Sequence, residues 1–242
     1  WFTVGLRQRD FFPEFAAEQS SESFDFHRPA FRDFIVALIL EVVERYPING
    51  VNLDFVRFGF SRQGHEAEQE AVVADVIRRV YLQSKKIKPE FVVSVCAAPW
   101  SPIIKQYGQN APKWADEGIV DVIYSMQYQY EPDFEITRQI QGGMRRPQAM
   151  VVMVGNYDRA VPSGKVSRRV AKRVCHLIEE ARKLSMGNGV ALYLYSMLND
   201  EQIDLLRKTV FSVPAKPSWV FAAPAIARSD SHPQPPKGLK IE

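Results

Sequence analysis

A carboxylate and a guanidinium follow the most informative strand that the sequence predicts. In residues 48–58 apolar side chains alternate with small or polar ones, so that Val51, Leu53 and Phe55 form one apolar face. Asp54 lies on the opposite face, close to the end of the strand. Parallel barrels place their reactive side chains at the carboxyl ends of strands. Asp54 is therefore the first candidate for chemistry.

Hydrolysis of an acetal needs a carboxyl group on each side of the scissile bond, one to donate a proton and one to act as base or nucleophile. Asp54 suits one of these roles, and Arg57 would keep it ionised or bind a substrate oxygen. A purely structural pair of Asp54 and Arg57 fits the spacing equally well. For the second carboxyl group we expect Asp158 or Glu131, because both directly follow polar strand ends. Each could also be a solvated loop charge or a helix cap.

Polar and aromatic side chains close the other predicted strands as well. Amide and phenol groups beside aromatic rings suit the hydroxyl groups and the faces of sugars. Together these strand ends would form one rim, which predicts a cleft that binds a polyol. Hydrogen bonding in the interior could explain any one of these residues alone. The predicted substrate-binding residues are Arg7, Asp10, Asn52, Arg57, Trp100, Gln127, Gln129, Asn156, Tyr157, Tyr193 and Tyr195.

The sequence shows no pattern typical of metal or serine-type chemistry. Metal sites need clustered ligands, and none of the four scattered histidines falls at a predicted strand end. The two cysteines, Cys96 and Cys175, lack metal-type spacing and are expected to be free, buried thiols. No G-x-S-x-G turn is present. We therefore expect neither a metal nor a cofactor.

Strands and helices are predicted to alternate along the chain. The alternation predicts an α/β fold with a parallel sheet, and specifically a (β/α)₈ TIM barrel. A complete barrel has eight strands in roughly 250 residues, whereas the six predicted strands fill about 210, so the first two βα units are expected upstream of Trp1. The alternative is an open doubly wound sheet, which usually carries a Gly-rich phosphate loop that this chain lacks. The strands are predicted at 1–8, around Asp54, and at 91–97, 121–129, 149–155 and 189–195, and the main helices at 27–46, 66–84, 166–184 and 200–209.

Composition predicts a globular domain followed by a tail. Residues 1–211 hold the six βα units, and the proline-rich residues 212–242 are expected to form a linker or a surface arm. The net charge is only +3 and no Lys/Arg run occurs, so we expect no nucleic-acid partner. No window approaches about 18 uncharged apolar residues, so no membrane span is predicted. The oligomeric state is not indicated.

The segment 44–58, ERYPINGVNLDFVRF, resembles the ERYDVDGVELDFxRFP signature of the family-10-like glycosyl hydrolases, a mainly bacterial TIM-barrel group. The resemblance extends over roughly residues 1–211. It implies a barrel that acts on a poly- or oligosaccharide by carboxylate acid/base catalysis, and a secreted or cell-envelope location. The chain departs from the family at Asn49 and Asn52, where acidic residues are common. An amide cannot exchange protons as a carboxyl group does, although it can bind a sugar hydroxyl.

This departure keeps two other functions open. The barrel could bind carbohydrate without cleaving it, with the aromatic and amide rim retained. It could also be a purely structural domain of a multidomain envelope protein. The three functions have different signatures. A glycosidase would cleave glycans, a binding barrel would bind them without turnover, and a structural domain would do neither.

Overall fold

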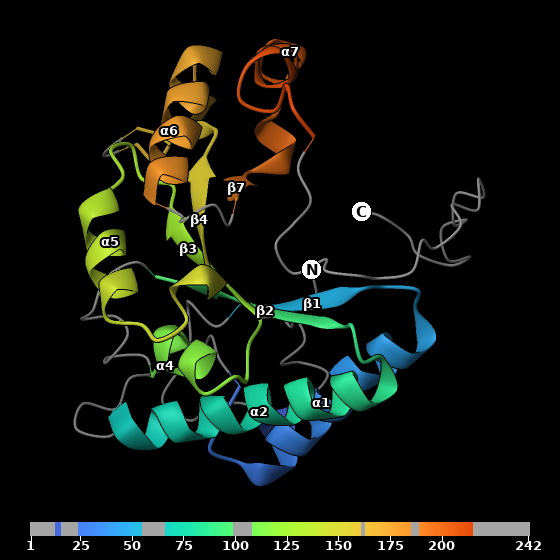
Figure 1. Cartoon of the computed structure of the whole chain (residues 1–242). Helices are drawn as coiled ribbons and strands as arrows, with labels where there is room; N and C mark the ends of the chain where they lie inside the picture. The colour runs from blue at the N-terminus through green and yellow to red at the C-terminus, as the bar shows by residue number, and fades with distance from the viewer. Residues whose placement is uncertain are drawn as a thin grey trace.

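A single parallel sheet forms the centre of the computed structural model, which describes residues 13–15, 24–54, 66–98, 108–160, 163–184 and 189–214. The five strands are hydrogen-bonded in the order β1-β2-β3-β4-β7, and every neighbouring pair is parallel. The sheet curls into half a barrel (Figure 1). Its strands are β1 (Gly50–Asp54), β2 (Val92–Ala97), β3 (Val122–Gln127), β4 (Met150–Gly155) and β7 (Val190–Tyr193).

Helices connect these strands and cover the outer face of the sheet. Crossovers between parallel strands are right-handed, so a strand order that advances in one direction places all connecting helices on one face. A doubly wound sheet reverses its order near the middle, and the described strands show no such reversal. The helices are α1 (Pro29–Arg45), α2 (Glu66–Ile87), α4 (Ala111–Asp116), α5 (Phe134–Gly142), α6 (Ala171–Leu184) and α7 (Asp200–Lys208), with short 3₁₀ turns η2 (Pro13–Phe15), η3 (Pro147–Ala149) and η4 (Tyr195–Met197).

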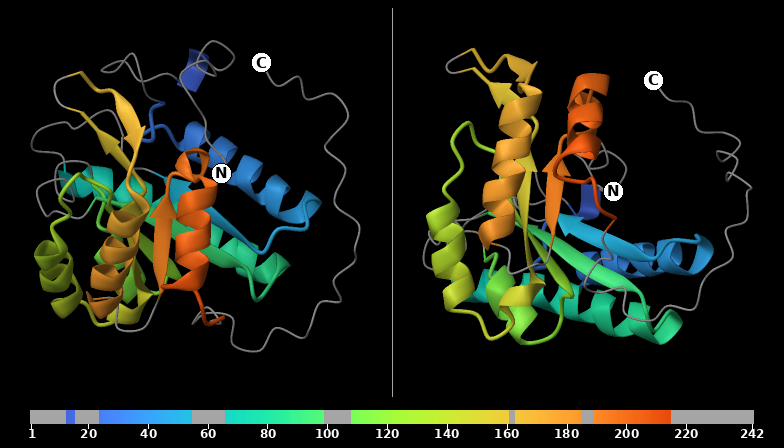
Figure 2. Two further views of the ribbon diagram at one scale, coloured as in Figure 1. Left: turned by 90° about the horizontal axis from the view of Figure 1, so that it is seen from above. Right: turned by 45° about the horizontal axis from the view of Figure 1, so that its top comes forward.

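The predicted α/β class and the parallel sheet are confirmed. Five of the six predicted strands are present, and the strand predicted at 1–8 lies outside the described residues. The prediction that a helix begins at residue 166 is wrong, because β6 (Val166–Arg168) pairs antiparallel with β5 (Tyr157–Arg159). Helix α6 begins only at Ala171. The resulting β5–β6 hairpin follows β4 and projects beyond the end of the sheet (Figure 2).

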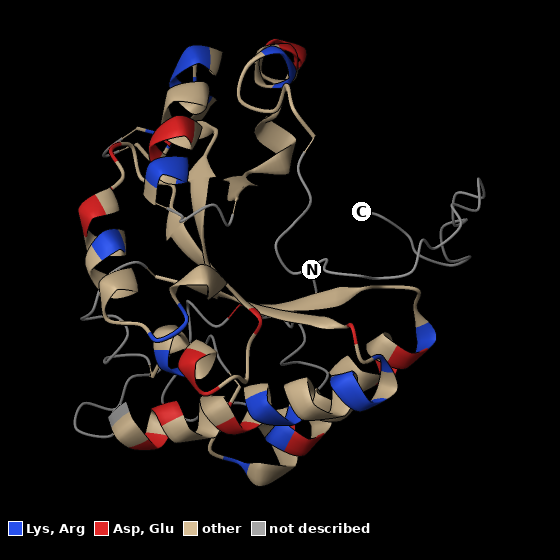
Figure 3. Cartoon of the chain, in the orientation of Figure 1, with Lys and Arg blue, Asp and Glu red and all other residues tan. Residues whose placement is uncertain are grey.

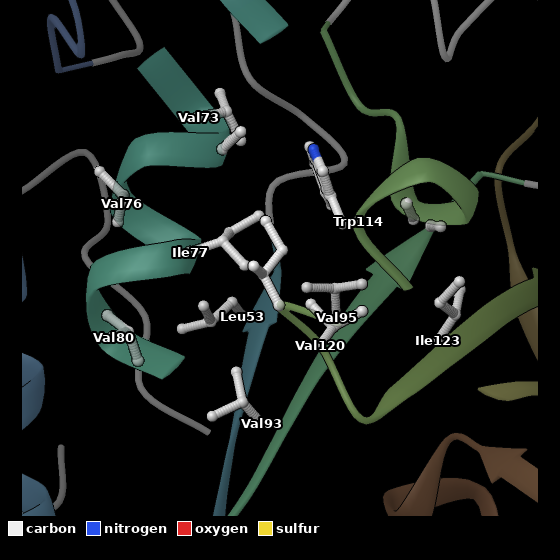
Figure 4. Close-up of a cluster of buried hydrophobic side chains, with 14 of the residues drawn as sticks. Leu53, Val73, Val76, Ile77, Val80, Val93, Val95, Trp114, Val120 and Ile123 are labelled. Atoms are coloured by element: carbon white, nitrogen blue, oxygen red, sulfur yellow. The ribbon is translucent and has the colours of Figure 1, made fainter. Parts of the chain in front are cut away.

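The larger part of the core lies between the outer face of β1–β3 and the first helices. The apolar positions of α1 recur at helical spacing and are buried at Phe31, Ile35, Ile39 and Val43. Burying one such side chain contributes about 1.5–3 kcal/mol. On α2 and β1–β3 the cluster includes Leu53, Val73, Val76, Ile77, Val80, Val93, Val95 and Ile123, several of which converge around Ile77 in Figure 4.

A second apolar cluster lies on the other half of the sheet. Val152 and Val154 of β4 pack against α6, where Val174 and Ile178 are completely buried. Leu206 of α7 joins the same cluster. The outer face of the sheet is therefore covered by two groups of helices, which meet where β3 pairs with β4.

Charged side chains lie mainly on the helices, with both signs mixed, whereas the five strands of the parallel sheet are almost free of them (Figure 3). Several charges pair between α1 and α2, such as Arg32 with Asp75 at 3.0 Å and Arg79 with Asp33 at 2.8 Å. Partly exposed pairs of this kind each contribute at most about 1 kcal/mol. Within the described ranges, no helix combines the length and apolar character needed to cross a membrane.

Candidate active site

Asp54 occupies the position that the strand pattern predicts. Leu53 is buried among the α2 side chains, so the alternate residues Asn52 and Asp54 point to the inner face of the curled sheet. Asp54 is the last residue of β1 and its side chain is exposed. The register of β1 and β2 sets it directly beside Cys96. An exposed carboxylate thus stands at a strand carboxyl end, as catalysis in a barrel requires.

Asn52 lies one step below Asp54 on the same face, and its amide is used within the sheet. Its Nδ2 donates to Cys96 Sγ at 3.2 Å, and its Oδ1 accepts from Ser94 Oγ at 2.9 Å. These contacts fix the Asn52 side chain between β1 and β2. Asn52 therefore supports the strand beneath Asp54, and both ends of its amide are already bonded.

The Cys96 thiol is strongly biased toward its neutral form. Burial raises its pKa to about 12, the hydrogen bond from Asn52 lowers it, and the negative charge of Asp54 raises it further. The thiol is therefore protonated at neutral pH and is a poor nucleophile.

Three tyrosines gather on the inner face at the other side of the sheet, and we call Tyr128, Tyr157 and Tyr193 the tyrosine cluster. The rings of Tyr128 and Tyr193 are stacked, with centroids 4.9 Å apart and planes inclined by 28°. Tyr157 completes the cluster at 6.3 Å from Tyr128 and 5.9 Å from Tyr193. Such rings offer flat apolar surfaces together with phenol hydroxyl groups.

Gly155 makes this stacking possible. It lies on β4 between Tyr128 at the end of β3 and Tyr193 on β7, with which it is paired in register. A Cβ atom at Gly155 would lie only 2.9 Å from Tyr128 Cβ and 3.1 Å from the Tyr128 carbonyl oxygen. The absence of a side chain therefore lets the two rings meet across β4.

An apolar floor connects Asp54 with the tyrosine cluster. Cys96, Ala98, Met126 and Met153 are buried together on the inner face, and Tyr124, Tyr128 and Tyr193 pack against them. Burial also raises the pKa of the Tyr124 hydroxyl. The described inner face thus carries a carboxylate on β1, a methionine-rich floor, and aromatic rings on β3 to β7.

The two other candidate carboxylates are held by arginines. Asp158 accepts from Arg169 Nε at 2.7 Å, and this arginine is only 2 % exposed. Arg169 also donates to the carbonyl oxygens of Gly155 at 3.1 Å and Gln129 at 3.0 Å. Glu131 is exposed and pairs with Arg173 Nη2 at 2.5 Å. Both acids follow strand ends as predicted, and both are engaged in ion pairs.

Gln127 lies on the opposite face of β3 from the tyrosine cluster. It is fully buried, and its Nε2 donates to the Asp133 carbonyl oxygen at 2.6 Å and to Thr137 Oγ1 at 3.0 Å. Its Oε1 accepts from the Asp133 N–H at 3.0 Å. The Gln127 amide therefore fixes the start of α5, and the structure does not bring it to the inner face.

Asn156 is likewise fully buried and bonded within the protein. Its Nδ2 donates to Gln202 Oε1 at 3.3 Å, and its Oδ1 accepts from the Leu194 N–H. The Tyr193–Leu194 peptide bond, which precedes this contact, is cis. Asn156 thus joins the ends of β4 and β7 to α7. Tyr195, in η4, is 86 % exposed.

Of the predicted substrate-binding residues, Asn52, Tyr157 and Tyr193 are brought to the inner face with Asp54. Four others, Arg7, Asp10, Arg57 and Trp100, lie outside the described residues. In the described part of the chain, no group of three or more His, Cys, Asp and Glu side chains could hold a metal ion. Cys96 and Cys175 are both buried and free, as predicted.

The sequence patterns predicted no role for Arg169, Met126, Met153 or Gly155. Arg169 lies within the segment 166–184 that was predicted as helix, and most of its partners are backbone carbonyls that leave no sequence signal. The inner-face methionines were visible as residues alternating with Gln127 and Val152. The aromatic and methionine side chains of β3, and not its amides, mark the inner face of this strand.

Solved structures share this fold, whereas no protein-family model and no curated protein matches the chain. The spore cortex-lytic enzymes SleL of Bacillus cereus and Bacillus megaterium match with TM-scores of 0.54 and 0.51 at 13% and 14% identity, over 75% and 76% of this chain and 54% of each enzyme. A chitinase from Chromobacterium violaceum matches with a TM-score of 0.52 at 12% identity, over 74% of this chain and 72% of the chitinase.

These similarities establish the fold. The chain spans about half the length of the two SleL enzymes. The matched proteins are named spore cortex-lytic enzymes and a chitinase, and at 12–14% identity the likeness shows the fold and does not single out the family-10-like group. Since one fold serves many activities, function has to be argued from the site.

Proposed function

We propose that this chain is part of an eight-stranded barrel that hydrolyses glycosidic bonds in a poly- or oligosaccharide. The observation that carries the proposal is the exposed Asp54 carboxylate at the carboxyl end of β1, on the inner face that also bears the tyrosine cluster. The sequential parallel sheet and its likeness to glycoside hydrolases support the architecture. The resemblance of residues 44–58 to family-10-like glycosyl hydrolases agrees with it.

In this proposal Asp54 acts as the acid/base or as the nucleophile. A glycosidase needs a second carboxyl group, about 5–5.5 Å away for a retaining mechanism and about 6.5–9.5 Å away for an inverting one. Asp158 and Glu131 are the proposed partners, because both follow strand ends.

The tyrosine cluster would bind the substrate. A sugar ring has an apolar face that packs on an aromatic ring, and phenol hydroxyl groups exchange hydrogen bonds with sugar hydroxyl groups. The predicted contacts of Arg7, Asp10, Arg57 and Trp100 remain part of the proposal. Tyr195, almost fully exposed beyond β7, would extend the aromatic surface along a longer glycan.

The variant Asp54→Asn tests the catalytic role. The full-length protein carrying it is expected to lose glycan cleavage, measured as release of reducing ends, because an amide can neither donate the proton nor form the glycosyl intermediate. The fold should persist, since Asp54 is exposed. The matched control is Asp204→Asn, an exposed aspartate of α7, which should retain activity. Full activity of Asp54→Asn would exclude the proposed role.

A second function is favoured by the residues that would have to supply the second carboxyl group. Asn52 replaces an acid found in the resembled family, and Asp158 and Glu131 are both paired with arginines. These observations fit a carbohydrate-binding barrel that does not cleave its ligand. A glycan array combined with a reducing-end assay separates the two functions, because the binding barrel would retain glycans without releasing ends. A purely structural domain would neither bind nor cleave.

A further inference from the structure

The β5–β6 hairpin carries an excess of positive charge. Arg159, Lys165 and Arg168 are exposed, and within the described ranges none of them forms an ion pair. The carboxylate of this hairpin, Asp158, is already bound by the buried Arg169. The hairpin therefore presents cationic groups that the neighbouring described residues do not neutralise.

Strand pairing places two of these cations on the side of the tyrosine cluster. Tyr157 is paired in register with Arg168, and Arg159 with Val166. Directly opposed residues share a face of a hairpin, as do residues two apart on one strand. Arg159 and Arg168 therefore lie on the face that carries Tyr157. Because Tyr157 packs against Tyr128 and Tyr193, the two guanidinium groups continue the tyrosine cluster outward.

The base of the hairpin is held firmly to the sheet. The Arg169 N–H donates to the Asn156 carbonyl oxygen at 3.0 Å, and Gln202 Nε2 donates to the Arg169 carbonyl oxygen at 2.6 Å. The Arg169 side chain adds its bonds to Gly155 and Gln129. Figure 2 shows the hairpin standing beyond the end of the sheet from this base. A ligand would thus meet a preorganised arm, which lowers the entropy cost of binding.

We propose that Arg159 and Arg168 bind carboxylate groups of an acidic poly- or oligosaccharide while the tyrosine cluster stacks on its rings. The inference rests on the proposed glycan-directed function and names its substrate class. A guanidinium fork matches the geometry of a carboxylate, and the bond is charge-assisted. A neutral glycan would leave both cations without a counter-charge. A nucleic acid fits less well, because the chain carries a net charge of only +3.

The test compares two ligands that differ only in charge. Calorimetric titration of the full-length protein uses a short oligouronic acid and the same oligosaccharide after reduction of its carboxyl groups. The double variant Arg159→Gln/Arg168→Gln should bind the acidic ligand about tenfold more weakly, as expected for the loss of two exposed charge pairs, and should bind the neutral ligand unchanged. Added salt should reduce the difference between wild type and variant.

The matched control is Lys86→Gln/Lys208→Gln, which removes the same charge from the exposed ends of α2 and α7, outside the hairpin. It should leave both affinities unchanged. Equal affinity of wild type and hairpin variant for the acidic ligand would overturn the inference. The inference would also be overturned if the wild-type protein bound a single-stranded oligonucleotide more tightly than the acidic oligosaccharide and the hairpin variant lost that binding, since this would indicate a nucleic-acid site.

The outcome also separates this inference from the proposed function. If the wild-type protein binds neither oligosaccharide, glycan binding itself fails. If it binds the neutral ligand as tightly as the acidic one, only the charge preference fails, and the glycan-directed function stands.

Discussion

Asp54 and Cys96 face each other across β1 and β2, and their chemistry is linked. The negative charge of Asp54 disfavours ionisation of the Cys96 thiol, and so does burial, so both favour the neutral thiol. The same apolar floor that keeps Cys96 protonated borders the proposed catalytic group. A thiol in this state fills space beneath the site and leaves the chemistry to the carboxylate.

The raised pKa of Cys96 predicts a loss of stability at alkaline pH. In the unfolded chain the thiol loses its proton near its ordinary pKa of 9.0, whereas in the folded protein it does so only near 12. Between these values the unfolded state binds fewer protons, so stability falls as pH rises, and below pH 9 the contribution is fully present. From pH 8 to pH 10 the loss should be about 1 kcal/mol more for wild type than for Cys96→Ala.

Urea unfolding at the two pH values measures this difference, with Cys175→Ala as the control for removing a buried thiol. The control variant retains Cys96 and should show the pH dependence of the wild type. An identical pH dependence in Cys96→Ala and wild type would contradict the linkage, since other titrating groups are common to both.

The ends of the strands are fastened by buried polar side chains that each join several elements. Gln127 ties β3 to the start of α5, and Asn156 ties β4 and β7 to α7. Arg169 does the same for the β5–β6 hairpin, with an ion pair to Asp158 and bonds to two carbonyl oxygens. Burying a polar group without a hydrogen-bond partner costs free energy, so removing one of these partners should destabilise the protein.

Arg169→Met should destabilise the protein by about 3–5 kcal/mol, because it leaves the partly buried Asp158 and two carbonyl oxygens without their donor. The matched control is Arg173→Met, which breaks the exposed pair with Glu131 and should cost less than about 1 kcal/mol. Chemical denaturation of both variants measures the difference. Equal small losses would mean that the hairpin base is not held by Arg169.

The elements that sequence could predict are those with a strong local signal. The alternation around Leu53 gave the correct face for Asp54, and the stripe from Phe31 to Val43 gave α1. Alternation could not tell which face of β3 points inward, because Tyr124 and Met126 alternate with Ser125 and Gln127 and both faces are covered. The strand 166–168 was predicted as helix because its pairing with 157–159 depends on a turn and on Arg169, whose partners lie 11 to 40 residues away.

At the scale of the molecule, the sheet connects two hydrophobic clusters. Ile77 on α2 belongs to the cluster that covers β1–β3, and Ile178 on α6 belongs to the cluster that covers β4 and β7. Both side chains are completely buried. The pairing of β3 with β4 runs from Ile123–Met150 to Gln127–Val154 and crosses the boundary between the clusters. The backbone hydrogen bonds between β3 and β4 are thus continuous across the boundary between the two hydrophobic clusters.

This continuity predicts that both halves unfold together. Ile77→Ala and Ile178→Ala should each lower the free energy of unfolding by about 2–5 kcal/mol, through lost burial and the cavity left behind. Both clusters cover the same hydrogen-bonded sheet, so loss of either cluster exposes strands that the other cluster also covers. Each variant should therefore shift a single unfolding transition, with the same midpoint by tyrosine fluorescence and by far-ultraviolet circular dichroism. Ile203→Ala, at a partly exposed position of α7, should shift it little. Two separate transitions, with each variant moving only one, would show that the clusters are independent units.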